Sequence, residues 1–135
     1  MVKMKIEYEG QLHCRLIHGP SSNVIATDAP RDNNGKGEAF SPTDLVAAAL
    51  GACMMTVMGI QAARHGVSIE GSTVDVEKEM VADPLRRIGN INVSLRMAKG
   101  IPTEKRGMLE AAAHSCPVHK SIHPDVKIPI EFIWD

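Results

Sequence analysis

An uncharged apolar stretch near the middle of the chain constrains the fold more than any other segment. From Leu45 to Ala63 no side chain carries a charge, and the apolar residues cover most of the circumference of a helix. Ser41 as N-cap, Pro42 in the first turn and Gly66 after the last turn predict where this helix begins and ends. A helix that is apolar on all sides is buried on all sides or lies in a membrane.

Composition favours burial in a soluble protein. The chain has 135 residues, 23% of them charged, and a formal net charge of -1, so neither nucleic acid nor an anionic membrane is an expected partner. Gly51, Thr56, Gly59 and Gln61 interrupt the apolar stretch, and the N-terminus lacks the continuous apolar core of a signal peptide. We therefore expect a single cytoplasmic domain over residues 1–135.

The remaining segments alternate between extended and helical patterns. Apolar and polar residues alternate with period two in five segments, which predicts strands, and residues 23–27 after a turn predict a further short strand. These are residues 3–9, 12–17, 23–27, 74–80, 90–97 and 126–134. Pro129 places the last of them at a sheet edge or a bulge. Residues 28–40, rich in Pro, Gly, Asn and charge, predict a loop before the long helix.

A second helix is expected from Thr103, as N-cap, to about Ser115, followed by a short helical turn over 117–122 that Cys116 caps. The order βββ-α-ββ-α-β predicts an α+β fold with antiparallel sheets packed against helices. A helix of about 25 residues is about 37 Å long, too long for one layer of sheet to wrap. We therefore expect a homodimer with this helix in its core.

Three cysteines are the candidates for chemistry. Without a signal peptide they indicate free or redox-active thiols rather than a structural disulfide framework. Cys14 is interpreted as a small core residue, the usual role of a lone buried cysteine. Cys53 lies in the middle of the long helix. Cys116 precedes Pro117, and a sulfur at a helix N-terminus favours the thiolate.

Two motifs in combination resemble one known family. The segment SPTDLVAAALGACMMTV, followed about sixty residues later by AAAHSCPVHKSI, is similar to the OsmC/Ohr proteins, the osmotically inducible and organic hydroperoxide resistance proteins. The resemblance extends over nearly the whole chain, and the CPVHKS segment resembles the OsmC-like branch. The family resemblance implies an intertwined homodimer with sheets wrapped around long central helices. This agrees with the homodimer expected from the length of the apolar helix.

The resemblance also implies a chemistry, namely reduction of organic hydroperoxides in oxidative or osmotic stress defence. Cys53 would be the peroxidatic thiol and Cys116 the resolving thiol, with a dithiol reductant restoring both and no cofactor. An apolar wall of Leu50, Met54 and Val57 would suit a small alkyl hydroperoxide.

One position departs from the family pattern. Active members place a glutamate ten residues before the first cysteine and pair it with an arginine that stabilises the thiolate. Here that position is Thr43, and Asp44 lies about 100° further round the helix. Arg15 or Arg31 would supply the cation. Thr43 favours an alternative, a non-catalytic dimer that binds a small lipophilic ligand in the apolar pocket around Cys53.

The histidines beside Cys116 allow a further interpretation. His114, Cys116 and His119 form an H-x-C-x-x-H pattern, but a metal site needs a fourth ligand and a rigid arrangement. Histidines at the surface or at a helix cap are the preferred interpretation, so no metal is predicted, and a soft-metal site is the lowest-ranked alternative. A cationic His119 would favour the thiolate of Cys116 or Cys53.

Overall fold

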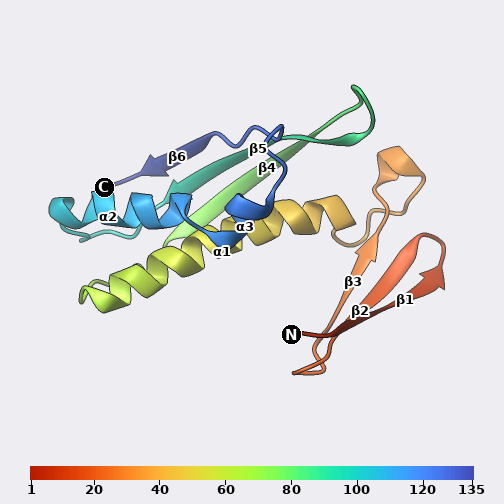
Figure 1. Cartoon of the computed structure of the whole chain (residues 1–135), viewed down its shortest axis with the longest axis horizontal. Helices are drawn as coiled ribbons and strands as arrows, with labels where there is room; N and C mark the ends of the chain where they lie inside the picture. The colour runs from red at the N-terminus through yellow and green to blue at the C-terminus, as the bar shows by residue number, and fades with distance from the viewer. The chain divides into compact units, whose positions relative to one another are not determined.

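The computed structural model describes all 135 residues and forms two compact units, residues 1–46 and 47–135. Strands and helices follow in the predicted order, and the α+β class is confirmed (Figure 1). The elements are β1 (Met4–Gly10), β2 (His13–His18), β3 (Val24–Asp28), η1 (Arg31–Asn33), α1 (Pro42–Arg64), β4 (Thr73–Val81), β5 (Arg87–Arg96), α2 (Thr103–His114), α3 (Pro117–Ser121) and β6 (Ile130–Ile133).

The N-terminal unit is an antiparallel sheet in the order β1-β2-β3. Ile6 pairs with Leu16, and Leu16 pairs with Ile25, so one face carries an apolar hollow of about 400 Å³. The alternating apolar side chains of β1 are not buried within the single chain, because Met4, Ile6 and Tyr8 are 65%, 58% and 66% exposed. Leu12, expected in the second strand, lies in the turn with φ +61.

Both ends of α1 follow from local sequence. Ser41 caps the first turn, as predicted, through a hydrogen bond from the Asp44 N–H to its side-chain oxygen. At the other end Gly66 adopts φ +67, and the Val67 N–H reaches back to the Ala62 carbonyl at 2.9 Å. That is the Schellman arrangement, in which a residue without a Cβ takes the left-handed conformation and ends the helix.

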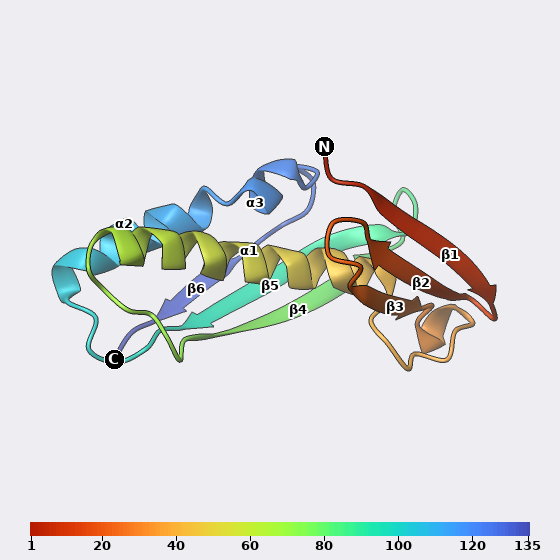
Figure 2. The ribbon, with the colours of Figure 1, turned by 90° about the horizontal axis from the view of Figure 1, so that it is seen from below.

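The second sheet has the order β4-β5-β6, with β4 antiparallel and β6 parallel to β5 (Figure 2). The prediction of purely antiparallel sheets is therefore wrong for β6. The chain crosses from β5 to β6 through α2 and α3, and a helical crossover returns a strand in the parallel direction. The edge position expected from Pro129 is confirmed, and the carbonyl of Pro129 accepts from the Val93 N–H at 2.9 Å.

The second helix begins at the expected residue but is not capped by it. Thr103 is already inside α2, and the flanking residue is Pro102, which offers no side-chain cap. Proline is favoured near helix starts because it has no N–H to satisfy and a preset φ.

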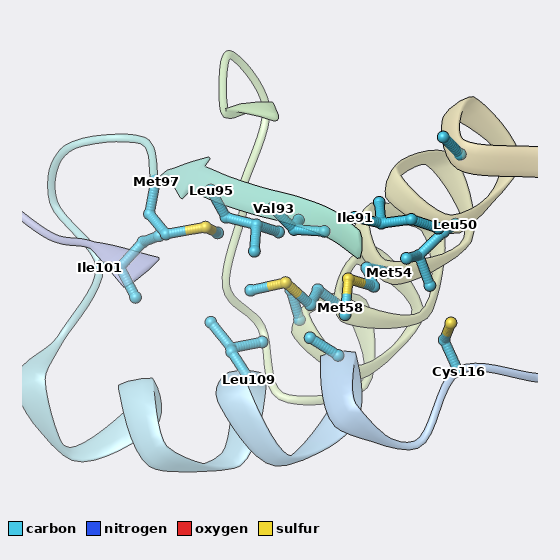
Figure 3. Close-up of a cluster of buried hydrophobic side chains, with 13 residues drawn as sticks. Leu50, Met54, Met58, Ile91, Val93, Leu95, Met97, Ile101, Leu109 and Cys116 are labelled. Atoms are coloured by element: carbon cyan, nitrogen blue, oxygen red, sulfur yellow. The ribbon is translucent and has the colours of Figure 1, made fainter. Parts of the chain in front are cut away.

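The core of the second unit lies between β5, α1 and α2. Figure 3 shows the buried side chains of these three elements converging on one cluster. It contains Leu50, Met54, Met58, Ile91, Val93, Leu95, Met97 and Leu109, none more than 2% exposed. Gly51 allows close contact between helix and sheet, since a Cβ there would lie 2.8 Å from Cγ2 of Val76. The core is thus built from aliphatic and thioether side chains.

Only one face of α1 is buried within the chain. Ile60 is 48% exposed, whereas Met58 two residues away is fully buried. By length and apolar composition α1 could cross a membrane. This is weak evidence for a membrane span, because core helices of soluble proteins pass the same test. Burial on all sides, as predicted from the sequence, requires a second copy of the chain, so the homodimer stays a prediction.

Candidate active site

Cys116 occupies the junction between α2 and α3. Pro117 fills the first position of α3, and the Cys116 sulfur accepts a hydrogen bond from the His119 N–H at 3.2 Å. The predicted cap is thereby confirmed, with the helical turn ending at Ser121. Cys116 is completely buried, so the cap holds its sulfur inside the apolar core rather than at the surface.

Cys53 faces the same cluster from α1. It is half-buried and packs against the core residues, among which Cys116 is counted. Figure 3 shows the Cys116 sulfur pointing from the α2–α3 junction toward the turns of α1 that carry Leu50 and Met54. Cys53 is close enough to Cys116 to be one of the groups that raise the pKa of the Cys116 thiol. The structure thus brings together the two cysteines that the sequence singles out.

The environment of Cys116 raises the pKa of its thiol. Burial is the largest cause, because the charged thiolate loses its hydration. The neighbouring Cys53 side chain acts in the same direction, while the backbone N–H groups of His119 and Val118 lower the pKa. Burial outweighs the short helix α3, so the expectation of a Cys116 thiolate is wrong. The Cys116 thiol therefore keeps its proton at neutral pH.

His119 is held neutral rather than cationic. Its pKa is lowered first by burial and then by the charges of Lys120 and His114. This direction opposes the cationic role considered from the sequence. The contact with Cys116 comes instead from the His119 backbone N–H, which sequence analysis missed although the Cys-Pro dipeptide is a signal for such a cap.

The H-x-C-x-x-H residues do not form a ligand set in this structure. No group of three or more His, Cys, Asp or Glu side chains is arranged to hold a metal ion. The His114 ring instead lies 5.9 Å from the ring of Phe132, in a tilted aromatic contact. The pattern here serves packing and helix capping.

The residues expected to form the apolar wall have different exposures. Leu50 and Met54 are fully buried in the core, whereas Val57 is half-buried and packs at the edge of the cluster. Val57, one helical turn after Cys53, is therefore the better placed of the three to meet a ligand. Their part in substrate binding stays a prediction.

The remaining candidates lie in the N-terminal unit. Thr43 is in the first turn of α1, with its hydroxyl 3.2 Å from the Ser41 hydroxyl. Arg15 on β2 is 3.6 Å from the Glu7 carboxylate, and Arg31 in η1 donates from Nε to the Lys36 carbonyl at 3.2 Å. Which arginine serves Cys53 stays a prediction.

Cys14 differs from the expected core residue. It lies on β2 opposite Tyr8 and Thr27 and is only half-buried. It belongs to the N-terminal unit and has no part in the cluster that holds the other two thiols.

Comparisons with known proteins agree with this fold. A family model described as OsmC-like protein matches residues 35–131. A candidate osmotic stress induced and detoxification response protein from Psychrobacter arcticus is 42% identical, with a TM-score of 0.92 over 98% of this chain and 96% of that one. A search of functionally curated proteins gives no match.

More distant structures share the fold. The organic hydroperoxide resistance protein OsmC from Legionella pneumophila is 20% identical, with a TM-score of 0.78 over 98% of this chain and 96% of that one. The organic hydroperoxide resistance protein OhrB from Bacillus subtilis is also 20% identical, with a TM-score of 0.69 over 98% and 97%.

Fold and sequence thus define an α+β protein with two of its three cysteines in one core cluster. The chain belongs to the OsmC-like family. That the family unit extends over residues 1–135 as one domain stays a prediction.

Proposed function

We propose that this protein reduces organic hydroperoxides with a pair of thiols, as part of a defence against oxidative or osmotic stress. The observation that carries the proposal is the interaction between half-buried Cys53 and buried, protonated Cys116 in one apolar cluster. Membership of the OsmC-like family and the fold shared with hydroperoxide resistance proteins support it.

The reaction divides between the two sulfurs. The Cys53 thiolate attacks the distal peroxide oxygen, the O–O bond breaks, and the alkoxide takes a proton and leaves as an alcohol. Cys53 is now a sulfenic acid. The Cys116 sulfur then attacks the Cys53 sulfur, and its proton leaves with the displaced hydroxyl as water. A dithiol reductant returns the disulfide to two thiols by exchange.

The surroundings of Cys53 favour an organic peroxide over hydrogen peroxide. Val57, one helical turn after Cys53 on α1, is a partly buried apolar side chain that packs against the core. An alkyl group gains by transfer from water to such surroundings, about 0.8 kcal/mol for each buried CH₂. We place the protein in the cytoplasm, where reducing conditions would supply the dithiol. We also propose a homodimer, in which the second copy would cover the open face of α1 and the apolar face of the N-terminal sheet.

Hydroperoxide consumption in the presence of a dithiol tests the proposal. Cys53→Ser should abolish turnover of cumene hydroperoxide. Cys116→Ser should permit one turnover and then accumulate sulfinic or sulfonic Cys53, detected by mass spectrometry. Cys14→Ser, which lies outside the cluster, is the matched control and should retain full activity.

Equal activity in Cys53→Ser and the parent protein would refute the peroxidase. The non-catalytic alternative, a dimer that holds a small lipophilic ligand near Cys53, would then stand.

A further inference from the structure

The His13 ring lies between two carboxylates in the N-terminal unit. Its Nδ1 is 2.5 Å from Oδ1 of Asp28, the residue opposite it in the pairing of β2 with β3. Its Nε2 is 3.6 Å from Oε1 of Glu9, near the end of β1. The Asp28 side chain is 5% exposed, whereas that of Glu9 is 46% exposed. One ring nitrogen therefore meets a buried acid and the other an exposed acid.

The two contacts respond differently to a proton on the ring. The hydrogen bond with His13 lowers the pKa of Asp28, so this carboxylate is ionised at neutral pH and accepts from the Nδ1–H. In a neutral ring Nε2 then carries a lone pair, which the Glu9 carboxylate repels. When Nε2 gains a proton, the same carboxylate attracts it. The Asp28 contact exists in both charge states, whereas the Glu9 contact depends on the ring proton.

The turn between β1 and β2 has an unfavourable backbone conformation. Gln11 and Leu12 both have positive φ, +53 and +61, at positions where tight hairpin turns favour Asn and Gly. The left-handed conformation is unfavourable for residues with a Cβ. Glu9 and His13 lie on either side of this turn, so their contact ties its two ends together.

We propose that Glu9 and His13 form a pH-dependent latch on the β1–β2 turn. Below neutral pH the protonated ring holds the Glu9 carboxylate and keeps the turn closed. Above neutral pH the neutral ring releases the carboxylate, and the turn opens to relieve its backbone conformation. The turn forms one wall of a polar hollow of about 390 Å³, so the latch controls how widely this hollow opens.

The other charged groups near the ring act on Asp28. Lys36 and Glu38 belong to the loop between η1 and α1 and line the same hollow. The positive charge of Lys36 contributes to the lowered pKa of Asp28, and the Glu38 N–H donates to its Oδ2 at 3.0 Å. Both stabilise the ionised Asp28, which leaves Glu9 as the acid whose contact follows the ring proton.

Hydrogen–deuterium exchange of the turn tests the latch, because it measures local opening in the intact chain. Exchange is followed by mass spectrometry at pH 5.5 and 7.5 and corrected for the intrinsic rate at each pH. In the parent protein the protection of residues 9–13 should fall about threefold from the lower to the higher pH, as expected for loss of one exposed ion pair. Glu9→Ala should be weakly protected at both pH values, without a difference between them.

Glu7→Ala is the matched control, because Glu7 on the same strand contacts Lys5 and Arg15 at 3.6 Å and no histidine. It should retain the threefold fall. A pH dependence that persists in Glu9→Ala would assign the effect to Asp28 and overturn the latch. Equal protection of the parent protein at the two pH values would overturn it as well.

A double variant tests the part played by the backbone of the turn. Gln11→Asn with Leu12→Gly supplies residues that accept the left-handed conformation, so protection should stay high at both pH values. The threefold fall, if it remained in this variant, would contradict opening by relief of the turn. No peroxide enters these experiments, so their outcome is independent of the peroxidase assay.

Discussion

The Ser41 side chain accepts a hydrogen bond from the Asp44 N–H at 3.0 Å, and the Asp44 carboxylate accepts one from the Ser41 N–H at 2.9 Å. Each residue satisfies a backbone donor of the other at the first turn of α1, the reciprocal arrangement of a capping box. Ser41 is 2% exposed, so water cannot replace its hydroxyl. This pair decides where the helix that carries Cys53 begins.

Removal of the Ser41 hydroxyl should destabilise the protein. Ser41→Ala leaves the Asp44 N–H without its acceptor and should lower the free energy of unfolding by about 1–2 kcal/mol. Ser41→Thr keeps an acceptor and should lose less than half as much. Urea denaturation followed by circular dichroism measures both, and an alanine variant as stable as the parent would contradict the cap.

Two glycines of α1 should respond differently to the same substitution. A Cβ at Gly51 would lie 2.8 Å from Cγ2 of Val76, whereas at Gly59 it would lie 3.8 Å from Cδ1 of Ile69, an ordinary contact. Gly59→Ala should stabilise the protein by up to about 1 kcal/mol through helix propensity. Gly51→Ala should destabilise it by about 1–2 kcal/mol, since overpacking outweighs that gain. If both variants gain stability equally in urea, the close helix–sheet contact is refuted.

The two faces of α1 should have separable roles. Ile60→Asp places a charge on the exposed face, so the fold should survive while sedimentation velocity shows monomers at micromolar concentration. Leu50→Asp buries a charge in the core of the chain itself and should prevent folding. Dimers of Ile60→Asp that persist at nanomolar concentration would show that this face is not the interface.

Stability should fall in acid through Asp28. Its pKa lies below the ordinary value of 3.8, chiefly because of the hydrogen bond with His13 and despite burial. A carboxyl with a lowered folded-state pKa stabilises the protein above its unfolded-state pKa, and this contribution is lost as the pH falls through the folded-state value.

His13→Ala should therefore be less stable than the parent at pH 7, with the difference shrinking below about pH 4. His18→Ala is the matched control, because the His18 ring hydrogen-bonds the neutral hydroxyl of Ser21. A His13→Ala deficit that is constant down to pH 2 would contradict the assigned hydrogen bond between His13 and Asp28. Thermal unfolding across the pH range provides the measurement.

Local features of the fold were predictable because they depend on residues within a few positions of each other. Ser41, Gly66 and the Cys116–Pro117 pair act through single hydrogen bonds or a single backbone angle, and each marks the helix end that the sequence indicates. The parallel β6 was not predictable in this way, because its direction depends on how α2 and α3 pack across the sheet. The exposure of Ile6 likewise depends on what lies outside the single chain.

In the candidate site, too, the features that depend on tertiary packing were not predictable from the sequence. Cys53 and Cys116 were identified together through resemblance to a family, and the structure brings their side chains into one cluster. The protonation of Cys116 was not predicted, because α3 is short and the extent of burial is a property of tertiary packing. The neutral state of His119 has the same origin, since its pKa is lowered by burial and by Lys120 and His114.

The methionine side chains of the core affect how long the folded protein survives in the presence of an oxidant. Met54, Met58 and Met97 are at most 2% exposed, and oxidation would turn each into a polar sulfoxide that no longer fits an apolar interior. The proposed peroxidase would thus keep these core thioethers away from the oxidant, whereas Cys53 at the edge of the core is only half-buried. Every transient opening of the core exposes them, so the working lifetime of the molecule under oxidant is set by how rarely it unfolds.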